Sequence, residues 1–178
     1  MHSKIKFTVH VSDDGKEVFT APLSYEALAN IISNYPDHDD SNDFFLLAAK
    51  HSACIVRENI AYKDHLSAEV VEILAKDRSA PVLRNLVRSS AFREQATHEQ
   101  LEKLINLDIE IAQSIANNVE LFQEADVVKL ANLLAAHEDP SVAASLADNY
   151  NAPKKILKKL LTHPDLYVAN AAKARLEN

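Results

Sequence analysis

The first twenty residues alternate between apolar and polar side chains. Residues 4–11 read KIKFTVHV and place an apolar side chain at every second position, which is the period of a β-strand with one apolar face. Asp14 and Gly15 are a preferred pair for a tight turn, and Val18 and Phe19 can return as a second strand. We predict a small β-hairpin here. Because an isolated hairpin is marginally stable in water, we expect its apolar face to cover the first turn of the next element.

A helical period follows the hairpin. From Pro22 to Ser33 the apolar side chains recur at three- and four-residue intervals, which is typical of an amphipathic helix. Pro36 disfavours helical backbone in the residue before it, so the helix is expected to stop near Asn34. The sequence therefore predicts one helix directly after the hairpin.

The next segment, residues 36–43, reads PDHDDSND and is polar and acidic. It divides the chain into an N-terminal part, residues 1–43, and a long remainder, residues 44–178. We interpret the segment as a solvated linker that also supplies the N-cap for a helix starting at Phe44. Its aspartates suit a hard divalent cation, but the glycine turn and final glutamate of an EF-hand loop are absent, and cation binding stays open.

One phrase recurs in the remainder of the chain. HEDPSVAASLADN at residues 137–149 returns as HPDLYVANAAKAR at residues 163–175, which is 26 positions later. Three looser copies precede these two, and each has a valine or isoleucine, here called the anchor, followed by an apolar residue four places on. The anchors are Val56, Val82, Ile111, Val142 and Val168, with spacings of 26, 29, 31 and 26 residues. Recurrence at this period indicates stacked structural repeats.

A second helical pattern lies between successive anchors, and cap residues introduce it. Ser67 opens one such stretch, and Thr97 with Gln100 has the spacing of a capping box. Three further pairs with a nearby proline are predicted helix starts: Asn151 with Pro153, Asp139 with Pro140, and His163 with Pro164. One pair of helices buries too little apolar surface to offset its ordering entropy, so adjacent pairs must stack. We therefore predict an all-α solenoid of about five two-helix repeats with a hairpin at the N-terminal end.

The copies resemble the leucine-rich repeat variant family and, more broadly, HEAT-like helical repeats. The family's aspartate a few residues before the valine is present as Asp108, Asp139 and Asp165, and its valine–arginine pair is present as Val56 and Arg57. The resemblance covers residues 44–176 and implies a right-handed α-solenoid that acts in recognition. Where the other copies would have arginine, they have Leu83, Ala112, Ala143 and Ala169. The iron–sulfur cofactor known in that family needs a cysteine cluster, and the single Cys54 means that it is not carried over.

Composition excludes several classes of protein. Gly15 is the sole glycine, and both the dinucleotide-binding fingerprint and the P-loop need more than one glycine, so the chain contains neither motif. One cysteine excludes an internal disulfide and fits a reducing compartment. No stretch approaches the roughly 20 apolar residues that span a membrane, and the N-terminal residues lack the apolar core of a signal peptide. We expect a cytoplasmic protein without membrane contact or cofactor, and the net charge of -7 argues against nucleic acid as partner.

A set of polar residues stands five positions before the anchors. It comprises His51, Asp77, Asn106, His137 and His163. Histidine and aspartate are metal ligands and proton carriers, so a metal site or a proton relay is one interpretation. The preferred interpretation is that these residues cap the anchor helices, because neighbouring repeats lie roughly 10 Å apart, too far for one metal ion to bridge most pairs.

A basic stripe near the C-terminal end is the main candidate for partner binding. Residues 151–178 carry six basic and two acidic side chains, which leaves -11 on the preceding 150 residues. The stripe consists of Lys154, Lys155, Lys158 and Lys159. It is either a solvated outer helix face or a docking site for an acidic protein segment or a phosphate backbone.

No arrangement of residues indicates a reaction. A convergent serine, histidine and acid cannot be recognised, and no H-E-x-x-H motif is present. We therefore predict no enzyme, no catalytic or metal-binding residue and no small-molecule substrate, and interpret the chain as a non-catalytic module that binds a protein or peptide. The alternatives are a nucleic-acid-binding HEAT-like protein that uses the basic stripe, and a metal-dependent hydrolase built on the polar set before the anchors.

Overall fold

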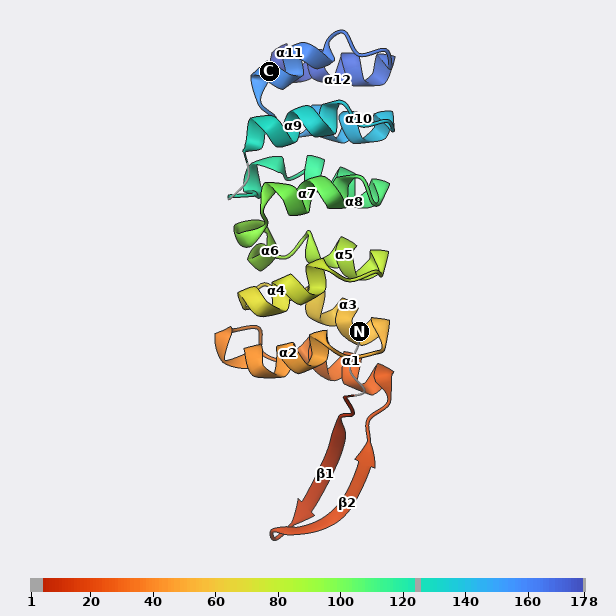
Figure 1. Ribbon diagram of the computed structural model, residues 1–178, viewed down its shortest axis with the longest axis vertical. Helices are drawn as coiled ribbons and strands as arrows, with labels where there is room; N and C mark the ends of the chain where they lie inside the picture. The colour runs from red at the N-terminus through yellow and green to blue at the C-terminus, as the bar shows by residue number, and fades with distance from the viewer. Residues whose placement is uncertain (1–4, 124–125, 178) are drawn as a thin grey trace. The chain divides into compact units, whose positions relative to one another are not determined.

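The computed structural model describes residues 5–123 and 126–177, and these are mostly helical (Figure 1). The predicted fold class is confirmed in its coarse form, helices preceded by a small antiparallel hairpin. The elements are β1 (Thr8–Asp13), β2 (Lys16–Pro22), α1 (Tyr25–Asn34), the 3₁₀ turn η1 (Asp39–Ser41), α2 (Asn42–Ala49), α3 (Cys54–Ala61), α4 (Ala68–Ala75), α5 (Ala80–Leu86), α6 (Ser90–Gln95), α7 (His98–Ile105), α8 (Ile109–Ala116), the 3₁₀ turn η2 (Val119–Leu121), α9 (Val127–Ala135), α10 (Pro140–Asp148), α11 (Lys154–Leu160) and α12 (Leu166–Glu177).

The chain forms two compact units. The first comprises Met1–Ala91 and the second Phe92–Asn178, so the border falls within α6. The division at residue 43, which rests on the change in composition there, stays a prediction.

The hairpin has the predicted tight turn. Asp14 and Gly15 both have positive φ, 44° and 76°, as a two-residue turn between strongly twisted strands requires. The pairing of Val11 with Phe19 is followed by a shift in register, which leaves one extra residue on β2 before Glu17 pairs with Ser12. Pro22 ends β2 and does not start a helix, and α1 begins at Tyr25, three residues after it, with Ser24 as its N-cap.

The apolar face of the hairpin is exposed. Val11 is 45% and Phe19 is 55% exposed, although they pair across the strands on one face. The expectation that this face covers the next element is therefore wrong for the strands themselves. Phe7, in the extended segment before β1, does reach the helices, and its ring packs edge-on against Phe44 with 5.7 Å between centroids.

Helices of the first unit pack in two layers. In one layer α3 lies against both α1 and α5, and in the other α2 lies against α4. The anchors Val56 and Val82 are fully buried near the starts of α3 and α5, as their spacing predicts. This arrangement places the start of α1 and the loop between α2 and α3 beside the base of the hairpin.

The acidic segment between α1 and α2 differs from its prediction in detail. It contains η1, and the residue preceding α2, Ser41, makes no side-chain cap hydrogen bond, so the predicted capping of this helix is wrong. One of its carboxylates is used instead to hold the next loop: Asp37 accepts from the backbone N–H groups of Asp64 and His65 at 2.9 and 3.0 Å. Asp64 in turn accepts from the N–H of Ser90 at 2.7 Å. Successive loops of the first unit are therefore joined by the same kind of contact.

The second unit repeats this two-layer packing. α10 lies against α8 and α12, and α9 lies against α7 and α11. The anchors of this unit are fully buried, and the predicted capping box at α7 is present. The anchors concerned are Ile111, Val142 and Val168.

Two predicted helix starts in the second unit are displaced. α11 begins at Lys154 after Pro153, and Asn151 lies outside it, with its N–H bound to the side chain of Asn149 at 2.8 Å. α12 begins at Leu166, and its first N–H groups are bound by Asp165, not by His163. Both misassigned residues lie in the turn that precedes the helix.

Candidate functional site

The polar set before the anchors braces turns. The Nδ1 atoms of His51, His137 and His163 accept from the backbone N–H two residues further on, at 3.0, 3.0 and 3.1 Å. The Asp77 carboxylate makes the equivalent bond to Ser79 at 2.9 Å. Asn106 differs, because its amide donates back to the Glu102 carbonyl. Most of the set thus fixes the residue that precedes the anchor helix, and within the described residues no group of three or more metal-ligating side chains converges.

Arg57 fixes the loop that carries His51. Its guanidinium donates to the backbone carbonyls of His51 and Ser52, both at 2.9 Å, and also to the buried carboxylate of Asp77. The loop between α2 and α3 is therefore held by a side chain that is itself paired. This loop, through His51 and Ser52, forms one wall of a pocket at the base of the hairpin.

The basic stripe is on the outer face of α11. Its four lysines are exposed, and the buried side chains Ile156, Leu157 and Leu160 face the other way. Lys159 donates to the Asn132 side chain on α9. In the described part of the chain no carboxylate lies within ion-pair distance of Lys154, Lys155, Lys158 or Lys159. The stripe is thus available to an anionic partner.

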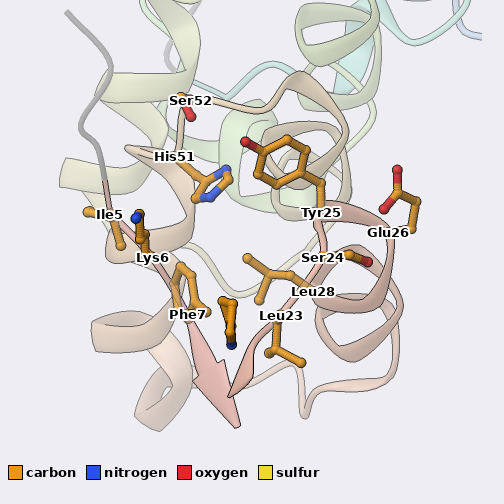
Figure 2. A pocket seen from close by; sticks show the side chains of 11 residues that line it. Ile5, Lys6, Phe7, Leu23, Ser24, Tyr25, Glu26, Leu28, His51 and Ser52 are labelled. Carbon is orange, nitrogen blue, oxygen red and sulfur yellow. The ribbon is translucent and has the colours of Figure 1, made fainter. Parts of the chain in front are cut away.

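A pocket at the base of the hairpin was not predicted from the sequence. Its volume is about 470 Å³, and three segments line it: the extended residues around Phe7, the link from Pro22 into the first turn of α1, and the loop at His51 and Ser52. Figure 2 shows the ring of His51 between Phe7 and Tyr25, with Leu28 below it. The pocket combines apolar walls with one buried polar ring.

Local backbone contacts position these walls. The N–H of Leu23 donates to the Phe7 carbonyl at 2.9 Å, which continues the strand pairing to the edge of the pocket. Ser24 then caps α1 and fixes the direction of its first turn. The ring of Tyr25 meets the His51 ring edge-on, with 5.5 Å between centroids. Hydrophobic and aromatic contact thus holds the imidazole ring from two sides.

His51 is the chemically distinctive residue of the pocket. It is 3% exposed, and its Nδ1 accepts from the N–H of Ala53, so the neutral ring carries its proton on Nε2. Burial is the main cause that lowers the pKa of His51, and the nearby Arg57 charge lowers it further. At neutral pH the ring is therefore uncharged and offers one N–H donor.

The acidic residue at the rim has a separate role. Hydrogen bonds to its own backbone N–H, and then to the Ser24 hydroxyl, hold the pKa of Glu26 below its usual value. Its carboxylate is exposed and lies at the start of α1, where a negative charge is favourable. Glu26 therefore serves its own helix and does not enter the deep part of the pocket.

The sequence carries a partial signal for this site. His51 stands out as a member of the polar set, but its partners Phe7, Tyr25 and Leu28 come from segments assigned to a hairpin and a helix. The local periodicity does not show that these segments meet at His51, because that contact depends on the angle between the hairpin and the helix α1 that follows it. The lysine stripe, by contrast, is an i, i+1, i+4, i+5 pattern on one helix.

Within the described residues, no helix has the length and apolar character needed to cross a bilayer. Comparison of the chain with family models, with curated proteins and with solved structures found no match in any of the three.

Proposed function

We propose that this chain is a non-catalytic protein-interaction module that binds its partner through the hairpin. The observation that carries the proposal is the exposed apolar face formed by Val9, Val11 and Phe19. Among the residues that the structure describes, β1 and β2 form a sheet of two strands, so both of its outer edges have backbone groups available for pairing. A lone hairpin of this size is marginally stable, so a partner that covers its face or adds a strand stabilises it and gains affinity in return.

The helical body supports this proposal as a scaffold. We infer that the helix pairs of the two units continue as one right-handed, HEAT-like solenoid, as the resemblance to helical repeats implies. Its support is the regular placement of the five anchors, each buried in a helix that packs on its counterpart in the neighbouring pair of the same unit. An array of this kind presents an extended surface suited to a protein or peptide. We also propose that the chain acts in the cytoplasm.

Affinity capture with matched variants tests the proposal. The full chain is immobilised as the wild type, as Val11→Thr with Phe19→Thr, and as the control Leu107→Thr, which removes an exposed apolar side chain in the second unit. Threonine keeps a high β-propensity, so the hairpin can still form. We expect a host protein that the wild type and the control retain and that the hairpin variant loses.

Direct titration of the purified partner completes this test. The hairpin variant should bind at least tenfold more weakly than the wild type, whereas the control should bind equally well. Equal capture by all three proteins would place the interface elsewhere. Circular dichroism and the amide NMR spectrum establish that the helices of the variant are intact.

A second candidate function is nucleic-acid binding by the lysine stripe. It is favoured by the exposure of the four lysines and by the absence of paired carboxylates around them within the described residues. Gel retardation of DNA and RNA at low salt decides between the two functions. The interaction module predicts no retention. Retention lost in Lys155→Glu with Lys158→Glu, but kept in Lys76→Glu with Lys103→Glu, would establish this second function in place of the first.

A further inference from the structure

We propose that the pocket at the base of the hairpin binds a small, neutral, apolar ligand that carries one carbonyl-type acceptor for the Nε2–H of His51. This site is distinct from the exposed strand face and does not depend on the function proposed above.

The walls define the size and polarity of the ligand. A volume of about 470 Å³ falls in the range of roughly 300 to 1,000 Å³ typical of small-molecule sites. Leu28 is 2% exposed and forms part of the apolar interior, and the rings of Phe7 and Tyr25 lie beside the ring of His51 (Figure 2). A molecule with one aromatic ring fits these dimensions and gains from removing apolar surface from water.

The donor defines the polar group of the ligand. His51 is almost completely buried and its Nδ1 is occupied by the Ala53 N–H, while in the described part of the chain no hydrogen bond is made by Nε2. A ligand that covers this donor without offering an acceptor leaves it unpaired at a cost of about 1–3 kcal/mol, so a ligand acceptor placed here is favoured over a purely apolar group. One donor calls for one acceptor.

The charges argue for a neutral ligand. The charged side chains on the wall, Lys6 and Glu26, are both exposed, so the interior is uncharged. An anion would gain little at the start of α1, because the Glu26 carboxylate already bonds to a backbone N–H there. A carboxylate placed inside would also lose its hydration without a cation to compensate it.

The turn role of His51 does not require an imidazole ring. The side-chain oxygens of Asp77 and Asn149 accept the same N–H two residues on, at 2.9 and 2.8 Å, with no ring at all. Nδ1 alone is sufficient for the turn at His51. The ring between Phe7 and Tyr25, and its Nε2–H, are therefore features that the turn leaves unexplained and that a ligand site would use.

The test compares three probes of one shape by NMR titration of the full chain. Acetophenone has the ring and the acceptor, ethylbenzene lacks the acceptor, and benzoate adds a charge. We expect acetophenone to shift the amides of Phe7, Tyr25 and Ala53 and to bind about fivefold or more tightly than ethylbenzene, as one hydrogen bond provides. Benzoate should bind no more tightly than ethylbenzene.

A variant and a direct observation isolate the donor. His51→Asn keeps the turn acceptor and removes Nε2–H, so the preference for acetophenone over ethylbenzene should vanish, whereas the control His163→Asn should keep it. In the wild type, the Nε2–H signal of His51 should move on addition of acetophenone and not of ethylbenzene, a readout that needs no folded variant. Equal affinity for the two probes in the wild type, no shift at saturating acetophenone, or a preference that persists in His51→Asn would overturn the proposal.

Discussion

Arg57 and Asp77 form a buried bidentate ion pair that joins two successive helix pairs of the first unit. Nε of Arg57 donates to Oδ2 at 2.6 Å and Nη2 donates to Oδ1 at 3.2 Å, and the two side chains are only 5% and 2% exposed. Arg57 lies on α3, and Asp77 lies in the turn before α5. Because both charges are removed from water, each depends on the other for its stability.

Removal of one partner of this pair should destabilise the first unit strongly. We expect Arg57→Leu to lower the free energy of unfolding by about 3–5 kcal/mol, because it removes the guanidinium that pairs with the buried Asp77 carboxylate. Leucine is a suitable replacement because the next repeat copy has Leu83 at the equivalent position, directly after its anchor Val82. Urea denaturation measures the change. The double variant Arg57→Leu with Asp77→Asn, which keeps a turn acceptor without the charge, should recover at least about 1 kcal/mol of it.

Gly15 should be important to the hairpin and not to the helices. Its φ is +76° and nothing lies within 4 Å of an added Cβ, so Gly15→Ala acts through backbone strain alone. We expect the hairpin to lose about 1 kcal/mol of local stability. Cross-strand NOEs between Val11 and Phe19 should weaken, whereas helix amides stay unchanged. Asp14→Asn is the control, because asparagine also tolerates positive φ, and it should leave the NOEs intact.

Glu120 should make the second unit sensitive to acid. Burial raises the pKa of Glu120, but hydrogen bonds from the Asn149 side chain, its own backbone N–H and the Asn151 side chain outweigh this and lower it below 4.5. The resulting stabilisation is present above the unfolded pKa and is lost as pH falls through the lower folded pKa. We expect Glu120→Gln to cost about 1–2 kcal/mol at pH 7 and progressively less below pH 4.5.

Thermal unfolding across this pH range measures the effect of Glu120. The control Glu102→Gln, at an exposed position of α7, should change stability by less than about 0.5 kcal/mol at every pH. A Glu120→Gln curve that runs parallel to the wild-type curve would contradict the assignment.

His163 should be replaceable by asparagine but not by alanine. Its Nδ1 accepts from the N–H of Asp165, which itself caps α12. Alanine leaves that N–H without its acceptor and should cost about 1–2 kcal/mol, whereas asparagine can make the bond that Asn149 makes to Asn151. Urea denaturation of the two variants gives the comparison. Equal stability of both would show that the turn does not need this acceptor.

The sequence predicted those features that depend on residues close in the chain. The Asp14–Gly15 turn, the capping box at Thr97 and the buried anchors follow from local conformational preference and from hydrophobic period, and all are present. The predicted helix starts at Asn151 and His163 are wrong. Asparagine and histidine side chains accept from backbone N–H groups in turns as well as at N-caps, and both of these residues lie in turns.

The pocket could not be predicted because it depends on contacts between distant segments. The base of the hairpin, the first turn of α1 and the loop at His51 are each ordinary in sequence, and only their packing encloses a space. The exposure of Phe19 was missed for a related reason. A period-2 pattern identifies an apolar face but not what covers it.

The loop contacts of the first unit also determine how many residues can be inserted into this chain or removed from it. Asp37 reaches N–H groups 27 and 28 residues ahead, and Asp64 reaches one 26 residues ahead. An insertion of a few residues between these loops moves donor and acceptor out of phase, whereas the gain or loss of a complete helix pair restores the same partners one step along. Gene duplication would thus lengthen the molecule only in whole modules, and shorter insertions would be confined to the loop tips.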